Sequence, residues 1–113
     1  MEDSIFTKII KREIKSEIIF ENEKIMAIKD INPQAPIHFL IFPKEQIETI
    51  NELTSDNSEL ISQIILTATE LARKYNVAEK GYRLVMNCND DGGQTVPHIH
   101  CHLIAGKRLK WEF

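Results

Sequence analysis

The stretch Pro97-His98-Ile99-His100-Cys101-His102-Leu103-Ile104 decides the fold, because histidines alternate with apolar residues along it. Successive side chains of a β-strand point to opposite faces, so the three histidines would share one face and the residues between them the other. The alternation therefore predicts a strand over residues 97–104 with an imidazole face and a core face. His38 is the one other histidine of the chain.

Further apolar runs at strand spacing lie upstream. Ile18 to Phe20 and Ile25 to Ile28 flank the polar tetrad Glu21-Asn22-Glu23-Lys24, which predicts a hairpin. A third strand is predicted from His38 to Phe42 and a fourth from Tyr82 to Met86. With the histidine strand, these segments predict a sheet of five strands.

Two segments have helical spacing instead. Ser4 precedes apolar residues at i, i+1, i+4 and i+5 and is a good capping residue, which predicts a short N-terminal helix. Residues 54–58 are polar and precede a longer helix. Its apolar residues fall mostly on one stripe: Leu60, Ile61, Ile64, Ile65, Leu71, Ala72 and Tyr75. Strands outnumber helices and short loops connect them, so the sequence predicts a single α+β domain over residues 1–113 with a largely antiparallel sheet.

The composition of the chain limits the classes of partner and the compartment that can be expected. The formal net charge is −3 and the 14 Lys and Arg residues are interspersed with acidic ones, so a nucleic acid polymer is not expected as a partner. Cys88 and Cys101 are too few for a disulfide framework, which indicates reduced thiols. The N-terminus lacks the pattern of an export signal, and the longest apolar run, Ile37 to Phe42, is too short to span a membrane. A cytoplasmic or nuclear location is expected.

Three interpretations of the histidine row remain open. It could be the polar face of a half-buried strand. It could bind a metal, since imidazole is a common zinc ligand, but His98 and His102 would start roughly 13 Å apart at a rise of about 3.3 Å per residue. A neighbouring pair would need a further ligand, for which His38 is the candidate. Third, a neutral imidazole can attack phosphorus and form a covalent intermediate, and the middle histidine, His100, is the natural nucleophile.

The loop before the row favours phosphorus chemistry. Asp91-Gly92-Gly93-Gln94-Thr95-Val96 contains adjacent glycines, which let a backbone approach an anion closely. Most such pairs are ordinary turns, but this one lies a few residues before the histidines. A phosphate cradle is therefore expected over this segment.

These motifs together resemble the histidine triad (HIT) family, and within it the Hint branch of nucleotide phosphoramidases. The run His98 to Ile104 has the form His-φ-His-φ-His-φ-φ, and four flanking segments look like family signatures in the expected order. They are Ser4 to Ile10, Asp30 to Leu40, Lys80 to Arg83 and Asp91 to Val96. The resemblance covers nearly the whole chain and implies the HIT-like fold and a homodimer with a sheet continued between the subunits.

The resemblance also implies roles for individual residues. His100 would be the nucleophile, His102 would contact a phosphoryl oxygen, and His98 and His38 would complete a polar relay that sets the tautomer of His100. Asp30 would hold the ribose of a purine nucleotide of the AMP or GMP type. The implied base walls are Ile5, Phe6, Ile9, Ile28 and Ile31. Near the phosphate and leaving group the family places the residues that match Asn87, Gly93, Thr95 and Val96, and Trp111 would reach the partner's site.

The expected activity is hydrolysis of purine nucleotide phosphoramidates, with aminoacyl adenylates as further candidate substrates, through a nucleotidyl-His100 intermediate and without a metal or other cofactor. Two alternatives remain: a dinucleoside polyphosphate hydrolase, and a nucleotide-binding scaffold with incidental catalysis. A zinc-binding role is a third. The sequence does not distinguish AMP from GMP.

Overall fold

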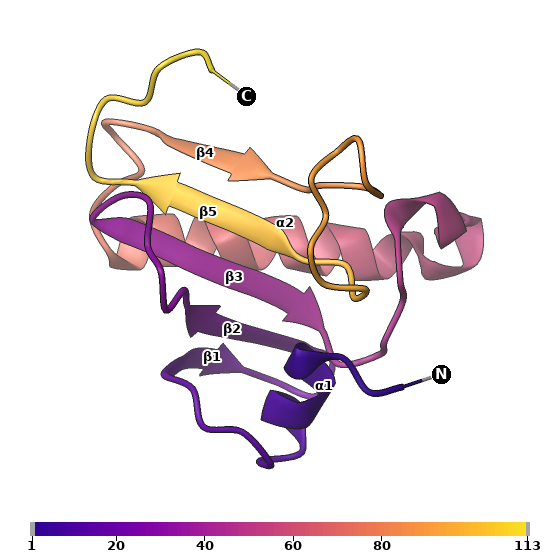
Figure 1. The fold of residues 1–113 in the computed structure, drawn as a ribbon. Coiled ribbons are helices and arrows are strands. Elements are labelled where there is room, and N and C mark those ends of the chain that lie inside the picture. Colours follow the sequence, from indigo (N-terminus) through magenta and orange to yellow (C-terminus); the bar gives the residue numbers. More distant parts are fainter. Residues whose placement is uncertain (1, 113) are drawn as a thin grey trace.

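Two helices lie on opposite faces of a five-stranded antiparallel sheet in a computed structural model that describes residues 2–112 (Figure 1). The predicted domain span also includes Met1 and Phe113, which lie outside the described residues. The strands are β1 (Ile18–Glu21), β2 (Ile25–Lys29), β3 (Ile37–Pro43), β4 (Tyr82–Val85) and β5 (Cys101–Ala105), in the sheet order β1-β2-β3-β5-β4. The helices are α1 (Ile5–Ile10) and α2 (Ser58–Lys74), and two 3₁₀ turns, Ile50–Glu52 and Ser55–Asn57, precede α2. The predicted α+β class, five strands and two helices are confirmed.

The long helix α2 covers the rear face of the sheet (Figure 1). Its buried residues Ile64, Ala68, Leu71 and Ala72 follow the i, i+4, i+7, i+8 spacing of one helical stripe. Tyr75 caps the helix and packs edge-on against Phe39 of β3, with 4.7 Å between ring centroids. Burying a side chain such as Ile64 contributes roughly 2 kcal/mol, so this stripe is a principal source of stability.

The short helix α1 lies on the opposite, front face (Figure 1). Ser4 caps it as predicted, because its Oγ accepts a hydrogen bond of 3.0 Å from the backbone N–H of Thr7. Phe6 and Ile9 are buried, and the Phe6 ring stacks on Phe42 of β3 at 4.4 Å. A helix of six residues is too short to be stable alone, so packing against the sheet stabilises it.

The fifth strand is shorter than predicted. Residues 97–100 precede the ladder, which begins at Cys101. Pro97 has no N–H for a ladder bond, the N–H of His98 donates to the carbonyl of Val96 at 2.8 Å, and the N–H of Ile99 donates to that of Ile47 at 2.7 Å. The predicted alternation of faces nevertheless continues through this segment, since Ile99 belongs to the core under α2 and the His98 ring packs edge-on against Phe6 and Phe42.

No helix within residues 2–112 has both the length and the apolar character needed to cross a lipid bilayer.

Candidate active site

The four histidines gather on the front face of the sheet, where β3 and β5 pair. Leu40 lies opposite His102 and His38 lies opposite Ile104, so the side chains of His38 and His102 meet diagonally across the two strands. His38, His98 and His100 are buried, and His102 is partly buried. Segments distant in the sequence therefore build one cluster of imidazoles.

His100 is held in a defined orientation by the backbone. Its Nδ1 lies 2.8 Å from the carbonyl oxygen of His98. A carbonyl only accepts, so Nδ1 carries the ring proton and Nε2 retains its lone pair. Burial lowers the pKa of His100, which keeps the ring neutral, and Phe6 packs edge-on against it at 5.0 Å. The arrangement leaves Nε2 as an available nucleophile.

A second hydrogen-bonded chain fixes His102. The backbone N–H of Gln34 donates to Nδ1 of His38 at 3.0 Å, so the proton of His38 is on Nε2. That N–H lies 2.9 Å from Nδ1 of His102 and 3.3 Å from Oδ2 of Asp30. A neutral His102 that accepts at Nδ1 carries its own proton on Nε2, as a donor.

His102 is the most strongly shifted group of the cluster. Burial first, and then the neighbouring rings of His100 and His38, lower its pKa from 6.5 to about 4, against a smaller opposing effect of Asp30. The ring is therefore neutral at physiological pH. The resemblance implies that His98 and His38 together set the tautomer of His100. In the structure, His98 bonds to His100 through its main-chain carbonyl, whereas His38 bonds to His102.

The predicted base walls divide into two groups. Phe6, Ile9 and Ile28 lie in the buried apolar cluster of the front face, and Val96 packs against its edge. Ile5 is exposed and Ile31 is 94% exposed, so neither is part of that cluster. Asp30 begins the loop after β2 and accepts a bond of 2.8 Å from the N–H of Asn32.

The predicted phosphate loop is shaped by its own side chains. Nδ2 of Asn87 donates to the carbonyl of Gly92 at 2.7 Å, and Gly93 has φ +78°. A Cβ on Gly92 would overlap the backbone of Cys88, so this position has no room for a side chain. Thr95 is exposed at the end of the loop. Trp111, in the C-terminal tail, is 83% exposed.

One group of side chains could hold a metal ion. Ligand atoms of Asp30, His38 and His102 lie within 4.8 Å of one another. The group contains His38, as the sequence suggested for a third ligand, together with a carboxylate that it did not. In the structure the same atoms form the hydrogen-bonded chain just described, so a metal would have to replace the proton on Nε2 of His38.

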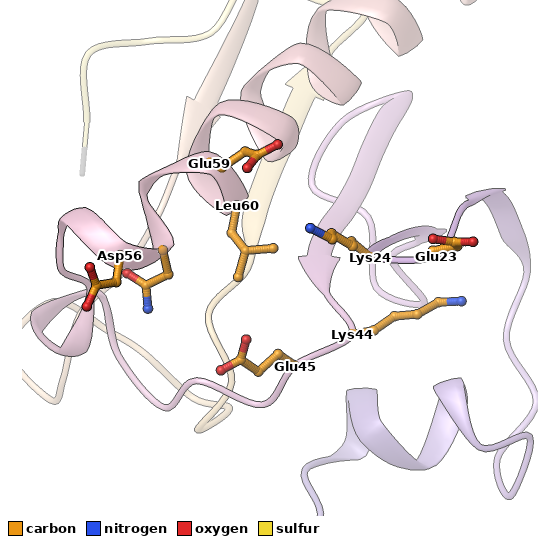
Figure 2. A pocket seen from close by; sticks show the side chains of 8 residues that line it. Glu23, Lys24, Lys44, Glu45, Asp56, Glu59 and Leu60 are labelled. Atoms are coloured by element: carbon orange, nitrogen blue, oxygen red, sulfur yellow. The ribbon is translucent and has the colours of Figure 1, made fainter.

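A cavity of about 330 Å³ lies apart from the histidines, between the turn before β2 and the start of α2 (Figure 2). Figure 2 shows Glu59 and Leu60 on the first turn of α2, facing Lys24 and Lys44. Lys44 forms an ion pair of 2.7 Å with Glu21. No histidine or cysteine lines this cavity, so its charged lining lacks the nucleophile found on the front face.

Four groups that the sequence analysis does not link to the histidines surround the His98 ring: the hydroxyls of Ser4 and Thr7, the carbonyl of Pro43 and, bonded to the hydroxyl of Thr7, the side chain of Gln46. The sequence identifies Ser4 as a helix cap, but nothing local indicates that its hydroxyl also lies 2.7 Å from Nδ1 of His98, 94 residues away. Only the fold brings these groups together.

Known proteins are similar to this chain in sequence and in architecture. The model of the HIT domain matches residues 11–109. A purine nucleoside phosphoramidase of Escherichia coli K12 is 44% identical over 108 residues, covering 96% of this chain and 91% of the relative. The crystal structure of a HIT family hydrolase from Legionella pneumophila superposes with a TM-score of 0.94 at 47% identity, over 96% of this chain and 97% of that one. A histidine triad protein from Clostridium difficile superposes equally well at 34% identity, over the full length of both chains. The chain therefore belongs to the HIT family, and it is a nucleotide hydrolase.

Proposed function

We propose that this protein hydrolyses purine nucleoside 5′-phosphoramidates and related adenylates, with His100 as the nucleophile. The observation that carries the proposal is that the neighbouring histidines differ in the protonation of Nε2, so that one ring can attack and the other can donate a hydrogen bond. His100 presents an unprotonated Nε2 and His102 an Nε2 with its proton. The name of the Escherichia coli relative, purine nucleoside phosphoramidase, supports the same substrate class.

The reaction divides into two displacements at phosphorus. Nε2 of His100 attacks, the bond from phosphorus to the leaving nitrogen breaks, and that nitrogen takes up a proton and departs as ammonia or an amine. The Nε2–H of His102 stabilises the charge on a phosphoryl oxygen. Water then attacks the nucleotidyl-His100 intermediate, which releases the nucleoside monophosphate and a proton and restores the neutral ring.

The substrate would bind on the front face of the sheet, which also carries the histidines. The cluster of Phe6, Ile9 and Ile28 would receive the base and Asp30 the ribose hydroxyls, whereas Ile5 and Ile31 would contact the base only from their exposed positions. The loop with Asn87, Gly93 and Thr95, ending at Val96, would surround the phosphate through its backbone amides.

We also propose a homodimer, in which Trp111 reaches the partner's site. β4 is an edge strand, paired on one side alone within residues 2–112, and all four of its residues are half-buried. Leu66 on α2 is exposed. An unpaired edge strand is a template for pairing with a second chain, and a continued sheet would cover it.

The test of the proposed reaction is direct isolation of the intermediate. Adenosine 5′-phosphoramidate is mixed with the protein and quenched in alkali, because a phosphorus–nitrogen bond to histidine is labile in acid. Peptide mass spectrometry should find the nucleotidyl group on His100, and H100G should lower kcat/KM by roughly 10⁴-fold.

The matched control is C101A, which changes the neighbouring residue on the α2 side and should retain kcat. Full turnover by H100G would overturn the proposed mechanism. Nucleotide binding without turnover by the wild type would favour a scaffold, and a higher kcat/KM for a dinucleoside polyphosphate would favour that alternative hydrolase.

A further inference from the structure

His98 is fully buried and has its own set of partners. Its Nε2 lies 2.7 Å from the carbonyl oxygen of Pro43, the last residue of β3. Because a carbonyl only accepts, Nε2 carries the proton. Burial lowers the pKa of His98, so the ring is neutral and Nδ1 must be an acceptor.

The proton that Nδ1 accepts can be identified by counting donors. The hydroxyl oxygens of Ser4 and Thr7 lie 2.7 and 3.4 Å from Nδ1. Thr7 has one hydroxyl proton and a shorter bond available to Oε1 of Gln46, at 2.7 Å. The Oγ of Ser4 accepts the N–H of Thr7 and has its own proton to give, for which Nδ1 of His98 at 2.7 Å is a closer acceptor than Oγ1 of Thr7 at 3.3 Å. The hydroxyl of Ser4 is therefore the donor to His98.

The main chain of His98 connects this bond to the nucleophile. The peptide between residues 98 and 99 accepts the Nδ1–H of His100 through its carbonyl, and its N–H donates to the carbonyl of Ile47. This peptide lies before the start of β5, so no ladder holds it in place. The bond to Ile47 holds its N–H, and the bonds at both ends of the buried His98 ring hold the residue that carries its carbonyl.

We propose that Ser4 is a positioning residue for the nucleophile: by donating to Nδ1 of buried His98, it holds the peptide whose carbonyl orients His100. The inference rests on the proposed function, in which Nε2 of His100 attacks phosphorus. The first turn of the chain thus acts on the reaction through His98, without contact with the substrate.

A second contact allows the positioning role to be separated from simple docking of α1. The backbone N–H of Ser4 donates to Oε1 of Gln46 at 2.9 Å, and this bond survives any change of the Ser4 side chain. Glycine is also accepted at a helix N-cap at a cost of only a few tenths of a kcal/mol relative to serine. S4G should therefore leave α1 docked while removing the donor to His98.

The experiment compares steady-state kinetics of the wild type, S4G and S4T on adenosine 5′-phosphoramidate. S4G should lower kcat by about tenfold, the effect of one lost buried hydrogen bond, with little change in KM, and S4T should restore kcat because it keeps the hydroxyl. The control is T54G, which removes the N-cap of the 3₁₀ turn before α2, where no imidazole is bonded. It should leave kcat unchanged.

A structural measurement tests the same bond without turnover. The ¹⁵N spectrum of the histidine rings should show His98 protonated at Nε2 and unprotonated at Nδ1 in the wild type, and the Nδ1 signal should shift in S4G and return in S4T. A His98 protonated at Nδ1, wild-type kcat in S4G, or a raised KM with unchanged kcat would overturn the inference. If the wild type does not turn over the phosphoramidate, the proposed function fails, while the ring spectrum still decides whether Ser4 holds His98.

Discussion

The two faces of the sheet differ in what covers them and in how their side chains are held. The rear face packs an apolar cluster against the 17-residue helix α2, and apolar contacts hold most of its side chains. The front face is covered by the six residues of α1 and, at its edge, by Val96, and its histidines make the hydrogen bonds described above. Stability is therefore concentrated on one face, and precise placement of polar atoms on the other. Substitutions on the two faces should separate these properties.

The largest expected effect is a loss of stability on the rear face. Ile64 is fully buried, so I64A removes core contacts and leaves a cavity, at a cost of about 3 kcal/mol in the free energy of unfolding. Chemical denaturation measures this cost, and kcat of the folded fraction should remain near that of the wild type.

The control for I64A is I14A, which deletes the same atoms at a residue that is 38% exposed. It should cost less than half as much. Equal costs for the two variants would mean that α2 is not the main source of stability.

The next effect concerns activity on the front face. H38A removes the N–H that bonds to Nδ1 of His102, so the proton on Nε2 of His102 is no longer fixed and kcat should fall by roughly 100-fold. F39L, at the next residue of β3, changes a side chain that faces α2 and should lower stability with kcat retained. A drop in kcat for F39L as large as that for H38A would contradict the conclusion that the front face controls activity and the rear face stability.

The smallest effect is a pH dependence of stability. The pKa of His102 lies near 6.5 in the unfolded chain and at about 4 in the folded one, so the unfolded chain binds a proton first as the pH falls. The contribution of His102 to the stability of the folded state is present above pH 6.5 and is lost progressively as the pH falls toward 4. The full shift corresponds to about 2 kcal/mol between pH 8 and pH 5, and because His102 is only partly buried, solvent screening should reduce the loss to about 1 kcal/mol.

Denaturation of the wild type and H102Q at both pH values measures this difference. The variant should depend less on pH, with a remainder from His98 and His100, whose pKa values burial also lowers. An unchanged slope in H102Q would show that His102 is not the group responsible.

The rear face was largely predictable from the sequence, because its features are periodic. The stripe on α2, the apolar run of β3 and the alternation of residues 97–104 are local patterns, and the structure follows them, apart from Ile65, which is exposed. The start of β5 differs from the prediction because apolar alternation does not report hydrogen bonding: Pro97 has no N–H, and the N–H groups of His98 and Ile99 donate to Val96 and Ile47.

The front face was predictable in its residue types but not in their partners. Alternation placed the histidines on one side, yet which ring bonds to which group depends on strand register and on atoms of the main chain. The contacts of His38 with Gln34 and of His98 with Pro43 involve backbone groups that have no sequence signal, and the contact of His38 with His102 depends on the register of β3 and β5. Exposure of Ile31 likewise depends on the path of a loop rather than on its composition.

The diagonal contact between His38 and His102 has a consequence for how the protein folds. The two residues are 64 positions apart, because α2 and β4 intervene between β3 and β5. Bringing such distant segments together carries a chain-closure entropy that local helices and hairpins avoid, so pairs of this kind form late on a folding pathway. The β1–β2 hairpin and α2 can form before β5 pairs with β3, but the hydrogen bond between His38 and His102 cannot. During refolding, nucleotide binding should therefore appear only after the helical circular dichroism signal has been regained. Binding of the nucleotide would then report that β5 has paired with β3.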